Sequence, residues 1–121
     1  MLDLLIKVIL VSAIAWFLFR RLIPAKGIRN ISTTELKMEL KNRDQQFIDV
    51  RTPHEYKGNH IKEFRNIPLN DLQKKANELS KDKEVFVICQ SGMRSSNASK
   101  MLKKMGFENV INVKGGMSAW R

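Results

Sequence analysis

Hydrophobic residues divide the chain into an apolar N-terminal segment and a longer region in which several patterns alternate. Residues 4–19 are apolar on all sides of a helix, apart from Lys7 and Ser12. An amphipathic helix at a membrane surface would have a polar face, which this segment lacks. About twenty residues are needed to cross a bilayer, and residues 1–23 reach that length if their basic side chains extend towards the headgroups. The pattern therefore predicts one transmembrane helix over 1–23.

A cleaved signal peptide is the alternative for this segment, because Ala13-Ile14-Ala15 has the small residues of a cleavage site. Against it, the apolar sequence continues after that site, and most of the basic residues follow the apolar run instead of preceding it. A retained anchor is therefore favoured. The positive-inside rule then predicts a single-pass protein of the cell membrane with its C-terminal domain in the cytoplasm. The basic residues behind this prediction are Arg20, Arg21, Lys26 and Arg29.

Residues 24–29 read as a short basic tether, and strand and helix patterns alternate from residue 30 onward. Apolar runs bounded by polar residues predict strands at Ile31, 47–50, 66–68, 85–88 and 110–113. A capping box at 32–35 and apolar residues at helical spacing predict helices over 32–42, 53–58, 70–79 and 95–105, with a short helix after Gly115-Gly116. Such alternation is typical of an α/β fold, in which helices cover both faces of a parallel sheet. The sequence therefore predicts one domain over 30–121.

The net charge of +10 is spread over small groups of basic residues, such as Lys74-Lys75 and Lys103-Lys104, between apolar helix positions. This is the pattern of a solvated helix face, so nucleic acid is not an expected partner. The positive charge instead favours the attraction of small anions. The chain has one cysteine, which excludes an intrachain disulfide, and its two histidines stand without a cluster of further ligands. No metal or cofactor is expected.

The segment Glu84–Ser96 carries the most specific chemistry. An apolar run of strand character ends at Cys89, and a short polar loop closed by Arg94 leads to a helical pattern. In a parallel α/β sheet, ligands bind at the carboxyl ends of the strands. Backbone N–H groups and the positive end of a helix dipole stabilise a thiolate, the form of cysteine that acts as a nucleophile. A buried structural cysteine is the alternative, but Gly92 and Arg94 stand where an anion cradle needs them.

The loop after Cys89 offers several groups to an anion. Gly92 lets the backbone turn and approach a substrate closely. Arg94 adds a positive fork that suits sulfonate or sulfate oxygens, and with the helix N-terminus it is expected to lower the pKa of Cys89. Successive backbone N–H groups can form a nest for an oxyanion. The residues predicted to bind substrate are therefore Gln90, Ser91, Gly92, Met93 and Arg94.

From about residue 30 to the C-terminus, the chain resembles the rhodanese-like sulfurtransferases. The resemblance rests on motifs in the expected order, namely Asp49-Val50-Arg51 with Pro53-His54-Glu55-Tyr56, Gly58-Asn59-His60-Ile61, Asn66-Ile67-Pro68, the loop from Cys89 to Arg94, and Gly115-Gly116-Met117-Ser118-Ala119-Trp120. Each motif is weak alone, whereas the ordered combination is highly specific. One departure is Glu63-Phe64, where the family usually has Gly-Ala after His-Ile-x. It affects a loop rather than the chemistry.

The resemblance implies a rhodanese-like α/β fold and a two-step sulfur transfer. The Cys89 thiolate would attack the outer sulfur of thiosulfate or of a persulfide donor, and a second nucleophile would remove the sulfur from the resulting persulfide. Cyanide, a small thiol or a partner protein are the expected acceptors, since the chain has no second cysteine. Asp49 and Arg51 are expected to support neighbouring turns. Glu55 and His60 match family motif positions and are expected to be structural.

Two other functions remain open. A cysteine-dependent phosphatase also uses a cradle of cysteine, loop and arginine, but five residues separate the two, whereas four separate Cys89 from Arg94. The shorter loop suits a sulfur atom better than a tetrahedral phosphate. The second alternative is a membrane-tethered binding or sensing module without turnover. The presence of both Cys89 and Arg94 weakens that alternative.

Overall fold

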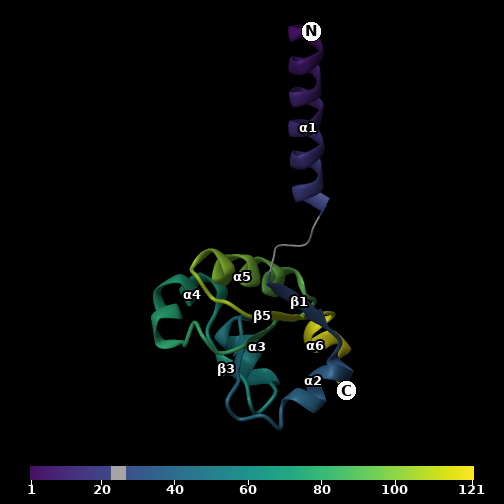
Figure 1. The fold of residues 1–121 in the computed structure, drawn as a ribbon. Helices are drawn as coiled ribbons and strands as arrows, with labels where there is room; N and C mark the ends of the chain where they lie inside the picture. Colours follow the sequence, from purple (N-terminus) through teal and green to yellow (C-terminus); the bar gives the residue numbers. More distant parts are fainter. Residues whose placement is uncertain (23–26) are drawn as a thin grey trace.

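The first helix stands apart from the rest of the chain. The structure is a computed structural model that describes residues 1–22 and 27–121, the side chains of 20–22 excepted. In helix α1 (Leu2–Leu22), the stretch Leu2–Phe19 has a mean hydropathy of 2.3, and none of it is buried. Figure 1 shows α1 extending away from the strands and the other helices. By length and composition α1 can therefore cross a membrane, a criterion that an N-terminal signal sequence also meets.

Five parallel strands form one sheet in the part of the chain that the structure describes. Their spatial order is β1 (Ile28–Ile31), β5 (Val110–Val113), β4 (Val85–Ile88), β2 (Gln46–Asp49) and β3 (Arg65–Asn66). β4 is the central strand, and its first residue, Val85, is paired with Gln46 of β2 and Val110 of β5. The predicted α/β fold with a parallel sheet is confirmed.

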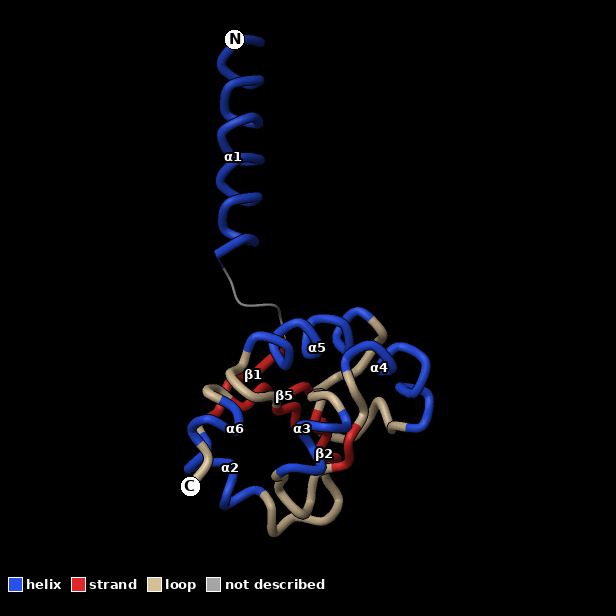
Figure 2. The backbone as a smooth tube through the Cα atoms, turned by 180° about the vertical axis from the view of Figure 1, so that it is seen from behind, coloured by secondary structure: helices blue, strands red, loops and turns tan. Residues whose placement is uncertain are grey.

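Helices lie on both faces of this sheet. Their bounds are α2 (Thr33–Glu39), α3 (Pro53–Gly58), α4 (Leu69–Lys75), α5 (Met93–Lys104) and α6 (Gly116–Ala119), and a 3-10 turn over Ala76–Glu78 follows α4. Figures 1 and 2 show α5 on one side of the strands and α2 and α6 on the other. The predicted helices on both faces are therefore present.

Two hydrophobic clusters attach the helices to the sheet. Side chains alternate along a strand, so Val87 of β4 faces α4 and α5 and packs in one cluster with Leu72 and Leu102. The neighbouring Phe86 faces the opposite side and belongs to a second cluster with Leu36 of α2. All four residues of β4 are buried, as expected for a central parallel strand covered on both faces. Cys89 directly follows this rigid strand.

Several element boundaries differ from the predicted ones, among them the starts of β1 and α5. β1 begins at Ile28, so Ile28 and Arg29, which were assigned to the tether, belong to the sheet, where they pair with β5. Their strand character was missed because β1 is an edge strand with two exposed residues. Tether residues 24–26 lie outside the described residues. α5 begins at Met93 rather than at residue 95, because Gly92, with a φ of 108°, turns the chain directly into the helix.

Phe64 lies in the segment between α3 and β3, but its side chain enters the core. It is 2% exposed, and its ring centroid is 5.3 Å from that of Phe47. Phe47 in turn lies 5.0 Å from Phe86 of the central strand. The departure from the family pattern at Glu63-Phe64 therefore adds an aromatic side chain to the second cluster.

Replacing Phe64 with alanine is expected to lower the free energy of unfolding by about 3–5 kcal/mol, because it removes a buried ring and leaves a cavity. The neighbouring Glu63 is exposed, so Glu63→Ala serves as a control and should change this free energy by less than about 0.5 kcal/mol. Urea unfolding of residues 27–121 measures both values. Similar effects of the two substitutions would contradict the core position of Phe64.

Candidate active site

Cys89 lies at the carboxyl edge of the sheet, immediately after β4. The loop from Cys89 to Gly92 leads directly into α5, so the N-terminal turn of this helix lies next to the sulfur. Cys89 is fully buried. Gly92 has the left-handed backbone conformation that the turn requires and that residues with a side chain rarely adopt.

Polar groups at the start of α5 hold the sulfur of Cys89. The N–H of Gly92 donates to Sγ at 2.9 Å, and the thiol donates to the hydroxyl of Ser95 at 3.4 Å. That hydroxyl donates in turn to the carbonyl of Gly92 at 3.1 Å. Ser95 is fully buried, so its hydroxyl is reserved for these contacts. Once the thiol has lost its proton, the hydroxyl can turn and donate to the thiolate.

The pKa of Cys89 lies below its usual value. Burial acts in the opposite direction, because it disfavours the charged thiolate and raises the pKa. The hydrogen bonds from the hydroxyl and the N–H of Ser95, and from the N–H groups of Gly92 and Ser91, outweigh that effect. The direction agrees with the expectation from the sequence. Of the two expected causes, the N–H groups at the start of α5 lower the pKa, together with the hydroxyl of Ser95, whereas the charge of Arg94 is not among the main causes.

The C-terminal segment holds the loop in place. The N–H of Met117 donates to the carbonyl of Cys89 at 2.8 Å, and the N–H of Ser118 donates to the carbonyl of Gln90 at 2.9 Å. Gly116 has a φ of 55°, and a Cβ atom there would collide with the carbonyl oxygen of Cys89. Glycine at this position therefore allows α6 to approach the loop closely.

Arg51 joins the loop to two neighbouring segments. Its Nη2 contacts the carboxylate of Asp49 at 2.8 Å, and these two side chains are 3% and 0% exposed. Nη1 donates to Oε1 of Gln90 at 3.2 Å, and Nη2 donates to the carbonyl of Asn59 at 2.6 Å. Arg51 therefore connects the end of β2, the residue after α3 and the loop. Because it is buried, Arg51 supports the site from within the protein.

Both terminal nitrogens of Arg94 bind the carboxylate of Glu55. Nη1 lies 2.7 Å from Oε1, Nη2 lies 2.9 Å from Oε2, and the two side chains are 35% and 30% exposed. The hydrogen bond from Arg94 lowers the pKa of Glu55 to about 2, so this carboxylate is charged at neutral pH. The sequence predicts that Arg94 binds substrate oxygens, whereas the structure pairs its guanidinium with Glu55.

The other side chains of the loop divide between support and surface. Oε1 of Gln90 accepts from Arg51, and its Nε2 donates to the hydroxyl of Ser118 at 3.2 Å. Ser91 and Met93 are exposed. The groups of residues 90–94 that remain for a substrate are therefore mainly backbone N–H groups, and substrate contact by these residues stays a prediction.

Within residues 1–22 and 27–121, no group of three or more His, Cys, Asp and Glu side chains is arranged to hold a metal ion. Nδ1 of His60 lies 2.8 Å from the carbonyl oxygen of Tyr56, and the two rings are stacked with centroids 3.9 Å apart. The hydroxyl of Tyr56 donates to the carbonyl of Phe64 at 2.5 Å. These contacts stabilise the segment that follows α3.

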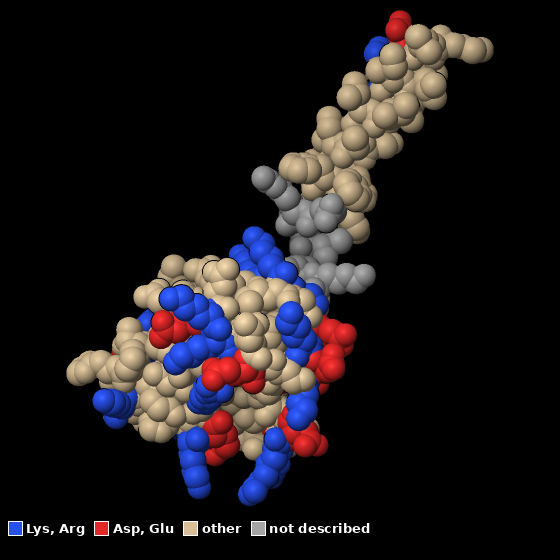
Figure 3. All heavy atoms as spheres, turned by 90° about the vertical axis from the view of Figure 1, so that its left-hand side faces the viewer, with Lys and Arg blue, Asp and Glu red and all other residues tan. Residues whose placement is uncertain are grey.

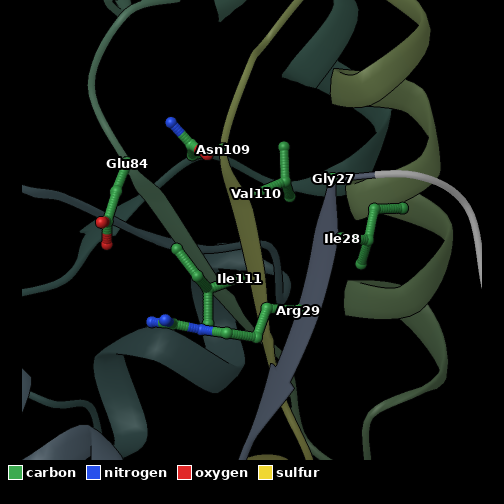
Figure 4. A pocket seen from close by; sticks show the side chains of 7 residues that line it. All are labelled: Gly27, Ile28, Arg29, Glu84, Asn109, Val110 and Ile111. Atoms are coloured by element: carbon green, nitrogen blue, oxygen red, sulfur yellow. The ribbon is translucent and has the colours of Figure 1, made fainter.

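A cavity of about 190 Å³ lies at the amino edge of the sheet, opposite the edge that carries Cys89 (Figure 4). Its lining residues stand at or near the starts of β1, β4 and β5, and are Gly27, Ile28, Arg29, Glu84, Asn109, Val110 and Ile111. Since Cys89 follows the other end of β4, this cavity is separate from the thiol.

A parallel sheet with a cysteine loop at its carboxyl edge defines an α/β domain with a candidate thiol nucleophile. The family model for the rhodanese-like domain matches residues 32–121. The chain therefore belongs to the rhodanese-like domain family.

Individual relatives agree with this assignment. The chain is 43% identical over 94 residues to the putative sulfurtransferase YtwF of Bacillus subtilis strain 168, covering 77% of this chain and 90% of that protein. It is 40% identical over 97 residues to the putative sulfur carrier protein YrkF of the same strain, covering 79% of this chain but only 52% of that relative. A rhodanese-like domain protein from Staphylococcus aureus superimposes with a TM-score of 0.71 at 32% identity, covering 77% and 91% of the two chains. Sulfur transfer is therefore the general kind of reaction that its relatives indicate.

The contacts of two site residues, Ser95 and Glu55, did not follow from the sequence. The hydroxyl of Ser95 contacts the sulfur, and the N-cap position of α5 is taken by Gly92. Glu55 was assigned to structure, and its pairing with Arg94 joins residues 39 positions apart. The periodic position of Ser95, on the buried face of α5, was a signal that its hydroxyl points inward.

Removing the Ser95 hydroxyl is expected to raise the pKa of Cys89, because the thiolate loses its side-chain donor. Ser95→Ala should therefore contain less thiolate near neutral pH and react more slowly with iodoacetamide. The alkylation rate measured between about pH 5 and 9 gives the midpoint for each variant. Ser96→Ala, one position along the helix, is the control and should leave the midpoint in place. An unchanged midpoint in Ser95→Ala would show that this hydroxyl does not stabilise the thiolate.

Proposed function

We propose that this protein is a membrane-anchored sulfurtransferase that carries sulfane sulfur as a persulfide of Cys89. The observation that supports the proposal most directly is the environment of the thiol. It is buried at the end of the central strand, it accepts a hydrogen bond from the N–H of Gly92, and its pKa is lowered. A thiolate stabilised in this way is prepared for nucleophilic attack on a sulfur atom.

In the first step, the thiolate of Cys89 attacks the outer sulfur of the donor. With thiosulfate, the S–S bond of the donor breaks, sulfite leaves with the bonding electron pair, and Cys89 becomes a persulfide anion. With an organic persulfide, the corresponding thiolate leaves. The total charge is the same before and after either step, so no oxidant or reductant is needed. The N–H groups of the loop stabilise the anionic sulfur on both sides of the reaction.

In the second step, an external nucleophile removes the outer sulfur and restores the Cys89 thiolate. Cyanide would leave as thiocyanate, and a thiol or a partner protein would leave as a persulfide. The acceptor is external because the chain contains a single cysteine. On the face seen in Figure 3, Lys and Arg side chains are interspersed with Asp and Glu. This face therefore lacks the continuous basic patch that is typical of nucleic-acid binding.

Cysteine-dependent phosphatase activity has less support. Four residues separate Cys89 from Arg94, and the guanidinium that would bind phosphate is paired with Glu55. A binding module without turnover would need no ionised thiol, so the lowered pKa of Cys89 favours the enzyme. Single-turnover formation of the persulfide distinguishes a sulfurtransferase from a binding module without turnover.

The site predicts persulfide formation on Cys89. Full-length protein incubated with thiosulfate should gain the mass of one sulfur atom in intact-mass spectrometry, and cyanide should remove it and yield thiocyanate. Cys89→Ser should show neither change, because a serine hydroxyl does not form a persulfide. Asn97→Ala is a suitable control, since Asn97 is exposed on α5 and lies outside the loop. Thiocyanate production by Cys89→Ser at the parent rate would exclude this function.

The proposed location is the cell membrane, with α1 as a retained single-pass anchor and the sulfurtransferase domain in the cytoplasm. The apolar length of α1 and the basic residues after it support this arrangement. Reducing surroundings also keep a working thiol in the reduced state.

Alkaline extraction of membranes should leave the full-length protein in the pellet, whereas a fragment over 27–121 should be soluble. An impermeant maleimide should label Cys89 only after the cells are opened, because the membrane separates it from a cytoplasmic thiol. Labelling in intact cells would place the domain on the outer side. A mature N-terminus near Trp16 would identify a signal peptide instead of an anchor.

A further inference from the structure

The ion pair between Arg94 and Glu55 lies at the end of α5 that holds the thiol. Arg94 is in the first turn of α5, whose N-terminus holds the sulfur. We propose that Glu55 makes the site selective for sulfur donors of low charge, namely organic persulfides, over dianionic thiosulfate, by holding Arg94 in an ion pair. This inference rests on the proposed sulfurtransferase function and names the donor class within it.

The contact between Arg94 and Glu55 uses both terminal nitrogens of the guanidinium and both oxygens of the carboxylate. Such a two-point pair is among the stronger polar contacts in proteins, and the same fork would otherwise suit the oxygens of thiosulfate. An anion therefore meets a guanidinium whose charge is already matched by Glu55, and it gains the edge formed by Nη1 and Nη2 only by displacing that carboxylate. About a third of each side chain is exposed, so an anion in solution can reach the pair and compete for it.

Glu55 is held in position by its own helix. It is the third residue of α3 and forms a capping box with Thr52. The hydroxyl of Thr52 donates to Oε1 of Glu55 at 3.0 Å, and the N–H of Thr52 donates to the same oxygen at 3.1 Å. The carboxylate is thus fixed before any donor arrives. Because Glu55 is already fixed, its ion pair with Arg94 costs no further side-chain entropy when a donor binds.

The charged side chains near the thiol form ion pairs with each other. Arg94 is matched by Glu55, and the buried Arg51 is matched by Asp49. What remains at the sulfur of Cys89 are neutral donors, the N–H of Gly92 and the hydroxyl of Ser95. An organic persulfide with one negative charge or none needs only such donors. Thiosulfate brings two negative charges and also meets the carboxylate of Glu55, which repels it.

Glu55→Gln tests the proposal because it removes the charge and retains the cap. Glutamine forms the same capping box, so α3 should keep its N-terminus. The full-length protein in detergent is assayed for persulfide formation with thiosulfate and, separately, with cysteine persulfide. Glu55→Gln is expected to raise kcat/KM for thiosulfate about five- to tenfold, mainly through a lower KM, and to change the value for cysteine persulfide less than about twofold.

Two further variants separate this effect from a general change in charge. Glu63→Gln removes an exposed carboxylate from the segment after α3 and should leave the ratio of the two donors unchanged. Combining Glu55→Gln with Arg94→Ala should abolish the gain for thiosulfate, because no guanidinium is then released. If Glu55→Gln does not fold, Glu55→Asp retains an acidic cap but is one methylene shorter, and it should shift the ratio in the same direction by a smaller factor.

Failure of this inference is distinct from failure of the proposed function. A parent protein that forms the Cys89 persulfide, together with a Glu55→Gln variant whose donor ratio is unchanged, would overturn the selectivity and leave the sulfurtransferase intact. The same holds if both donors improve equally. A parent protein that accepts neither donor would overturn the function itself.

Discussion

The guanidinium of Arg51 is shared among the segments that surround Cys89. It is bound to Asp49 at the end of β2, to the carbonyl of Asn59 after α3, and to the side chain of Gln90 in the loop. Loss of one partner from such a buried pair typically costs about 3–5 kcal/mol, because the other charge is left without compensation. The position of α3 relative to the loop depends on this contact, and with it the position of Glu55.

The thiolate is stabilised chiefly by groups that have no net charge. The N–H donors of the loop and of α5 are fixed by the backbone, and the hydroxyl of Ser95 is fixed by burial. Short-range contacts of this kind in a buried site are screened little by salt. The ionisation of Cys89 therefore depends mainly on these neutral donors, and in the proposed selectivity Arg94 serves the discrimination among donors.

The alternation of apolar runs was sufficient to predict the parallel sheet and the place of Cys89, because both depend on local periodicity. Two features depended on contacts between distant segments and were not predictable in that way. Phe64 enters the core through neighbours on β2 and β4, and Arg94 pairs with a carboxylate on α3. The predicted length of β1 was too short, because an edge strand with exposed Arg29 and Asn30 lacks a continuous apolar run. The family motifs located Glu55, but they did not assign it a partner.

The parallel direction of the strands has a consequence for how this protein meets its partners. All amino ends of the strands lie on one edge, so β1 receives the chain from α1 on that edge, while the thiol follows β4 on the other. A strand of four residues spans about 13 Å, and this length of sheet separates the two places. The start of β1 and the thiol are therefore at opposite edges of the sheet, and in the proposed membrane arrangement a soluble protein can approach the sulfur without passing the attachment point.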